Sequence, residues 1–302
     1  MKSGSINWIF LLVTVLFITS CDSVESDSQS SDEQTVEETS AENSNDDETG
    51  ASTKVEYVLP SPMEIASLIE RTGIKYEEGI LNPVENEENY NNNFKKGVNL
   101  GVYGADLGLI LVFEQTQDAI TYFKTVKNLA EELGIAGAFE KSTIDRVEAN
   151  LSNRDSLMLI AGEAFRDADM YLKENERGPI STIVLAGGWI EALFISCSFG
   201  TSTLDPQVLN RIGEQKVSLQ TLISMMQRVK LEGKDYEGLT EKLNDLKASF
   251  DKVQIDYEEI PEEPHPDKQI TEVKRISSIT ITEPIFKEIA SKVNAIRSDL
   301  VK

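Results

Sequence analysis

The chain has 302 residues and a formal net charge of −23 at pH 7, a length that suits one sizeable domain or two small ones. This charge argues against nucleic acid as a partner, because phosphate binding needs a basic surface and no cluster of Lys or Arg occurs. The one histidine, His265, and the two cysteines form no cluster with the spacing of zinc ligands. The sequence also lacks the Walker loop, the G-x-G-x-x-G motif and the G-x-S-x-G nucleophile elbow, so we predict no cofactor.

The first twenty residues have the organisation of an export signal. Lys2 makes the start positive, an uncharged run follows over residues 6–17, and small residues precede Cys21. The run is shorter than the roughly 20 apolar residues that a membrane-spanning helix needs. We therefore expect residues 1–20 to be a signal peptide.

The sequence Ile18-Thr19-Ser20-Cys21 closes this segment and resembles the bacterial lipobox, in which Ala or Ser is commoner than Thr19. The resemblance implies a bacterial lipoprotein precursor that is cut before Cys21, whose sulfur accepts a diacylglycerol. Two or three acyl chains, palmitate among them, hold a protein firmly, since each buried CH₂ contributes about 0.8 kcal/mol. An uncleaved anchor, or a soluble secreted protein with an incidental cysteine, is the alternative interpretation.

The lipobox resemblance also implies a place in the cell envelope, where the lipid makes the membrane a partner. The outer membrane is favoured over the inner one, and the periplasmic or surface face is left open. Asp22 is similar to an inner-membrane retention signal of some bacteria and to a surface-export signal of others. Once Cys21 carries lipid, Cys197 is the one remaining cysteine, and no intramolecular disulfide can form.

Residues 21–56 are predicted to be a lipidated cysteine followed by a disordered acidic linker. Positions 22–53 contain eleven Asp or Glu and no Lys, Arg or aromatic residue. Such a segment buries too little apolar surface to offset the entropy of ordering it. Its predicted role is to hold the body away from the membrane.

The body, residues 57–302, has apolar side chains at helical spacing along most of its length. A polar, Asn-rich loop is predicted over 82–93. Amphipathic stripes then predict helices over 119–133, 157–172, 209–229, 236–253 and 286–300. Alternation over 253–257 and 276–282 predicts an antiparallel β-ribbon, and Thr282 is expected to cap the last helix. The fold class is therefore mainly α, a helical bundle with a small β-ribbon near the C-terminus.

Two segments, 98–113 and 180–199, are apolar on nearly every side, and each contains one acid, Asp106 or Glu191. The second is long enough to span a bilayer, but a charge near its middle is costly in lipid. We therefore expect both to be buried core helices.

Several glycines of these two segments lie at helical spacing. In the first segment they form one face, and in the second they precede an acid by three and four positions. Glycine in a helix costs about 1 kcal/mol relative to Ala, which points to close packing of the two backbones. A groove left open for a ligand is the alternative. The glycines concerned are Gly101, Gly104, Gly108, Gly187 and Gly188.

Glu191 is the leading candidate for a polar site, because it shares a helical face with Gly187 and Gly188. A buried acid needs hydrogen bonds or a cation. The structural interpretation is a Lys, Arg or Tyr partner within the bundle, and the functional one is a ligand contact. Asp106 is the weaker candidate, because its angle points away from the glycine face of its own helix. No catalytic residue is predicted.

The stretches Gly101-Val102-Tyr103-Gly104-Ala105-Asp106 and Gly187-Gly188-Trp189-Ile190-Glu191 loosely resemble uncharacterised helical envelope lipoproteins, a likeness that transfers no activity. We expect a lipid-anchored envelope protein with a non-catalytic binding or scaffold role, whose partner is an envelope protein or a small ligand. The alternative is a carboxylate-dependent hydrolase that acts on glycan or a similar envelope polymer, with two carboxyl groups in an open cleft.

Overall fold

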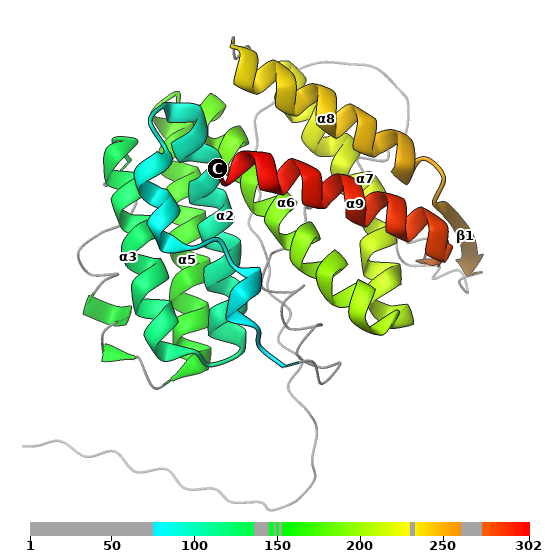
Figure 1. Cartoon of the computed structure of the whole chain (residues 1–302), viewed down its shortest axis with the longest axis horizontal. Helices are drawn as coiled ribbons and strands as arrows, with labels where there is room; N and C mark the ends of the chain where they lie inside the picture. Colours follow the sequence, from blue (N-terminus) through cyan, green and yellow to red (C-terminus); the bar gives the residue numbers. More distant parts are fainter. Residues whose placement is uncertain (1–74, 136–144, 148, 151–152, 230–232, 261–273) are drawn as a thin grey trace, which may run out of the picture. The chain divides into compact units, whose positions relative to one another are not determined.

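The computed structural model describes residues 75–135, 145–147, 149–150, 153–229, 233–260 and 274–302. All of them belong to one compact unit that runs from Lys54 to Lys302. The described residues are mainly helical, which confirms the predicted bundle with its β-ribbon near the C-terminus (Figure 1). The signal peptide, the acidic linker and His265 lie outside the described residues.

The helices and strands lie close to the segments that the periodicity indicates. In chain order they are η1 (Glu78–Ile80), η2 (Val84–Asn89), α2 (Asn93–Val112), α3 (Thr116–Glu132), α5 (Arg154–Glu174), α6 (Gly178–Thr203), α7 (Pro206–Arg228), α8 (Lys234–Phe250), β1 (Gln254–Ile260), β2 (Lys274–Thr280) and α9 (Glu283–Leu300).

Local chemistry explains where several of these helices begin. The side chain of Asn92 accepts a hydrogen bond from the Lys95 amide at the start of α2, and Asp205 caps α7 in the same way. Thr282 occupies the N-cap position of α9, but its side chain makes no capping hydrogen bond. The expected loop over 82–93 is wrong in part, because η2 forms a 3₁₀-helix there.

The two apolar segments form α2 and α6, which pack against each other along their length. Helix α6 also contacts α5, α7 and α9, so other helices surround it. Among the described residues it alone is long and apolar enough to cross a bilayer, and 67 % of its most apolar window is buried inside the bundle. This packing is that of a central core helix.

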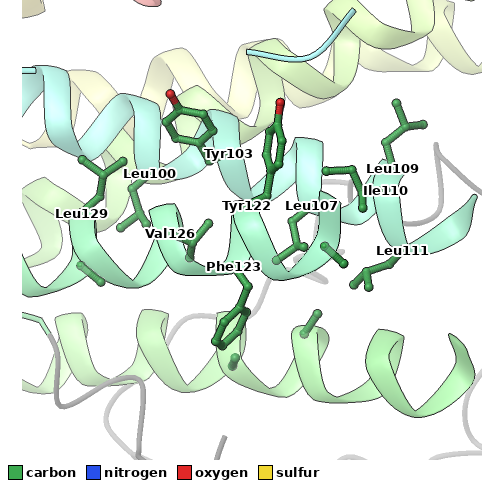
Figure 2. Packing of buried hydrophobic residues seen from close by; sticks show 14 of the residues in the cluster. Leu100, Tyr103, Leu107, Leu109, Ile110, Leu111, Tyr122, Phe123, Val126 and Leu129 are labelled. Atoms are coloured by element: carbon green, nitrogen blue, oxygen red, sulfur yellow. The ribbon is translucent and has the colours of Figure 1, made fainter. Parts of the chain in front are cut away.

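The core consists of two clusters that meet at α6. In the first, α2 packs against α3 and α5 (Figure 2), and two tyrosines, Tyr103 and Tyr122, lie side by side with their hydroxyl ends directed away from the aliphatic residues. In the second, α6 packs against α7 and α9, and α8 packs against those two helices. Helix α9 crosses α6 and ends beside α2 (Figure 1), so it reaches the boundary between the clusters.

The β-ribbon is antiparallel, with Gln254 opposite Thr280 and Ile260 opposite Lys274. Strand β1 continues past the predicted stretch 253–257 to Ile260, and β2 begins before the predicted stretch 276–282, at Lys274. Ile279 packs on α7 at Gly213, where an added Cβ atom would lie too close to the Ile279 side chain. The ribbon therefore attaches to the outside of the bundle and does not contribute to the α2–α6 contact.

Candidate functional site

Three of the five glycines predicted to allow close packing, Gly101, Gly187 and Gly188, lie where α2 and α6 approach each other, and Gly104 and Gly108 are buried in α2. A Cβ atom on Gly101 would overlap the backbone of Val184, and one on Gly187 would overlap the carbonyl oxygen of Val98. A Cβ atom on Gly188 would lie 3.4 Å from the oxygen of Gly101. The two backbones therefore touch here, and no space for a ligand is left between them at these positions.

Glu191, in the middle of α6, pairs with Arg297 of α9. The Nε atom of Arg297 donates to Oε2 of Glu191 over 3.0 Å, and Nη2 donates to Oε1 over 3.1 Å. The side chain of Glu191 is fully buried and that of Arg297 is 12 % exposed. Bidentate, charge-assisted pairs are among the strong hydrogen bonds of proteins. This contact joins α9 to the centre of α6.

Two further contacts hold the guanidinium of Arg297. Its carbon lies 4.6 Å from the centre of the Phe194 ring, the geometry of a cation–π contact. Its Nη2 atom also donates to the backbone oxygen of Ile80 over 3.3 Å. Arg297 thus connects η1, α6 and α9. The sequence indicated a structural partner of this kind for Glu191, but it did not identify which residue.

Asp106 lies beside Glu191, although its angle on α2 was expected to direct it away from the glycine row. It sits between Gly104 and Gly108, all three are buried, and its carboxyl group is within hydrogen-bonding reach of Glu191. Because the two helices touch at their glycines, residues on the flank of α2 also come close to α6. Oδ2 of Asp106 accepts a hydrogen bond from the Asn82 amide over 3.0 Å, whereas Oδ1 has no donor among the described residues.

Asn82 connects this acid pair to the residues around it. Its backbone oxygen accepts from the Tyr122 hydroxyl over 3.0 Å, and its side-chain oxygen accepts from Asn86 over 2.8 Å. Its Nδ2 atom donates to the Tyr90 hydroxyl over 2.9 Å and to Asn99 Oδ1 over 3.4 Å. Every polar atom of Asn82 is therefore satisfied, which matters because a buried group without a partner costs about 1–3 kcal/mol.

The end of α9 completes the cluster. Asn99 Nδ2 donates to the backbone oxygen of Leu300 over 2.9 Å, and the Tyr90 hydroxyl donates to that of Val301 over 3.4 Å. These bonds satisfy carbonyl groups at the helix end, which have no partner within the helix. We call the whole cluster the polar junction; its members are Asn82, Tyr90, Asn99, Asp106, Glu191 and Arg297.

Burial raises the pKa of both carboxyl groups in the polar junction. For Asp106, burial has the largest effect and the negative charge of Glu191 raises the pKa further. For Glu191, burial also raises the pKa, but Arg297 opposes the shift. Among the described residues, a single guanidinium thus faces two buried carboxyl groups, an arrangement that favours the neutral form of one of them.

The polar junction lacks the access that catalysis requires. A glycosidase needs two carboxyl groups about 5–10 Å apart in an open cleft, whereas Asp106 and Glu191 have no exposed surface. A groove of about 300 Å³ does open between α8 and α9. Its carboxylates include Asp245 and Asp299, and these pair with Lys292 and Lys242 of the same groove.

Cys197 is buried in α6, as the sequence indicated, and burial raises the pKa of its thiol. A buried thiol of this kind is a poor nucleophile. In the part of the chain that the structure describes, no three His, Cys, Asp or Glu side chains gather as a metal site would require. Comparisons with protein-family models, with curated proteins and with solved structures found no match.

Proposed function

We propose that this chain is a lipid-anchored protein of the bacterial cell envelope whose helical body has a non-catalytic binding or scaffold role. The observation that carries the proposal is the run Ile18-Thr19-Ser20-Cys21 after a short uncharged segment. The thiol of Cys21 is the group that would accept the lipid, and the acidic residues that follow would form the tether.

The arrangement of the buried acids supports a non-catalytic body. Arg297 donates to both carboxylate oxygens of Glu191, and the side chain of Asp106 is fully buried. Both carboxyl groups are therefore occupied by contacts within the protein. The hydrolase alternative has no comparable support among the described residues, and incubation of the purified body with envelope polymer tests it. Release of soluble fragments would contradict the non-catalytic role.

Lipid attachment is tested by replacing Cys21 with Ser in cells fed a fatty-acid probe. Cys21→Ser should abolish labelling completely, because the hydroxyl of Ser does not replace the thiolate as lipid acceptor. Cys197→Ser is the matched control, and it should keep full labelling because this thiol is buried in the folded body. Labelling that persists in Cys21→Ser, or is lost in Cys197→Ser alone, would rule out the assignment.

The tether is tested by the melting temperature of a chain that begins at Lys54. Because the preceding acidic segment has few apolar groups to bury, its removal should leave the melting temperature of the mature protein unchanged. Circular dichroism measures both proteins under the same conditions. A fall of several degrees would show that the segment packs on the body.

A further inference from the structure

The polar junction contains one cation and two buried acids. Arg297 neutralises Glu191 through hydrogen bonds to both carboxylate oxygens. Asp106 has one amide donor on Oδ2 and none on Oδ1. A carboxylate oxygen without a donor is costly in a buried site, whereas a carboxylic acid in the same place can donate to Glu191. The geometry therefore needs a proton between the two acids.

We propose that Asp106 and Glu191 share one proton, that this proton keeps α9 latched to α2 and α6, and that its loss loosens the C-terminal end of α9. Without the proton, two negative charges face a single guanidinium in a site closed to water. The repulsion between the two acids, and the cost of burying two charges with one counter-charge, then favour opening of the polar junction to water at the end of α9, which is held there by its backbone bonds to Asn99 and Tyr90.

In the part of the chain that the structure describes, the other groups around the acid pair do not supply a second positive charge. The charged groups that act on Glu191 are Arg297 of α9 and Asp106 of α2, and α5 and α7 add none. The other titratable neighbours among the described residues are a tyrosine that follows η2 and tyrosines on α2 and α3. Burial raises the pKa of each of them, so they stay uncharged as the pH rises: Tyr90, Tyr103 and Tyr122.

The direction in which pH weakens the hold on the end of α9 follows from the direction of the pKa shift at Asp106. Its pKa in the folded protein is raised above the unfolded value of about 3.9. The stability that its protonated form provides is therefore fully present below about pH 3.9 and is lost as the pH rises toward the folded pKa. The latch is closed in acid and loosens toward alkaline pH.

Replacing Asp106 with Asn in the full mature chain tests this directly, because the amide donates like the acid but cannot lose its proton. Melting temperatures of both proteins are measured between pH 4 and 10. Relative to the unmodified chain, Asp106→Asn should gain roughly 3–5 °C for each pH unit up to the folded pKa of Asp106 and then level off. A constant difference across the whole range would overturn the proposal.

Glu288→Gln is the control for this experiment. Glu288 lies on α9 near the surface, and its hydrogen bonds to Lys252 and Ser249 lower its pKa. Its contribution is therefore present above the unfolded pKa and lost in acid, the opposite direction to that of Asp106. Glu288→Gln should show no relative gain above pH 6. A gain equal to that of Asp106→Asn would mean that the trend is a general effect of removing negative charge.

Hydrogen exchange on the unmodified chain tests the loosening itself and does not depend on any variant folding. The amide of Val301 bonds to Arg297 in the last turn of α9. After correction for the intrinsic exchange rate, protection of this turn should fall by tenfold or more as the pH rises past the folded pKa of Asp106 that the melting profiles give, while that of α8 stays constant. Protection that falls equally in both helices, or in neither, would contradict the latch.

Discussion

Replacing Arg297 with Met should lower the free energy of unfolding by about 3–5 kcal/mol at neutral pH, the usual cost of removing one partner from a buried ion pair. Met fills similar space against Phe194 but leaves the fully buried Glu191 without its cation. Urea denaturation followed by circular dichroism measures the change. A loss below about 1 kcal/mol would show that Glu191 does not depend on Arg297.

The loss in Arg297→Met should shrink in acid. Burial raises the pKa of Glu191, and Arg297 is the group that opposes this shift, so its removal raises the pKa further. A raised acid contributes stability below its unfolded pKa, about 4.3, and loses it as the pH rises. The difference from the unmodified protein should therefore be smaller at pH 4 than at pH 7.

Two other variants test whether the loss of stability and its pH dependence are specific to the buried pair of Glu191 and Arg297. Glu191→Gln removes the carboxylate and should show a comparable loss without recovery in acid, because no titrating group is left at that position. Lys242→Met breaks a pair with Asp299 in which both side chains are about half exposed, and it should cost about 0–1 kcal/mol. An equal loss in Lys242→Met would mean that burial is not what makes the Arg297 pair strong.

Replacing Gly187 with Ala should lower the free energy of unfolding by about 1–3 kcal/mol, the range typical of overpacking. The added Cβ atom would overlap the backbone of Val98 on α2. A backbone atom cannot rotate away as the end of a side chain can, so the whole helix must move. This steric cost outweighs the gain of about 1 kcal/mol that Ala offers over Gly in a helix.

Gly238→Ala is the matched control, since Gly238 also lies inside a helix, α8, but has no atom within 4 Å of its Cβ position. It should stabilise the protein by up to about 1 kcal/mol through helix propensity alone. The two substitutions are chemically identical and differ in what the new methyl group meets. A stabilised Gly187→Ala protein would show that α2 and α6 are not in backbone contact.

Local periodicity was enough to predict most of the helices, because each helix buries one stripe of its own residues. The apolar stripe over 119–133, for instance, corresponds to α3, and Gly134 adopts the left-handed conformation that ends it. The two segments that are apolar on all sides became the central helices α2 and α6. Their glycines indicated a close approach before its partner positions were known.

The polar junction could not be assembled from the sequence in the same way. Arg297 follows the apolar Ile296 in an amphipathic helix, and Asn82 begins an Asn-rich polar stretch, so both resemble solvent-exposed residues. Their burial depends on contacts between segments far apart in the chain, which leave no local periodicity. The shared helical face of Glu191 with its glycines indicated one half of the pair but could not identify the other.

The polar junction also determines when the protein can finish folding. Arg297 bonds to Ile80 across 217 positions, and Tyr90 bonds to Val301 across 211. Contacts of such long sequence separation form slowly, because the chain must close a large loop first. Until α9 has been synthesised, Glu191 and Asp106 lack the cation Arg297, which disfavours burying them in ionised form between α2 and α6. For the exported, lipid-anchored protein proposed above, this delay would favour passage through the membrane in an unfolded state.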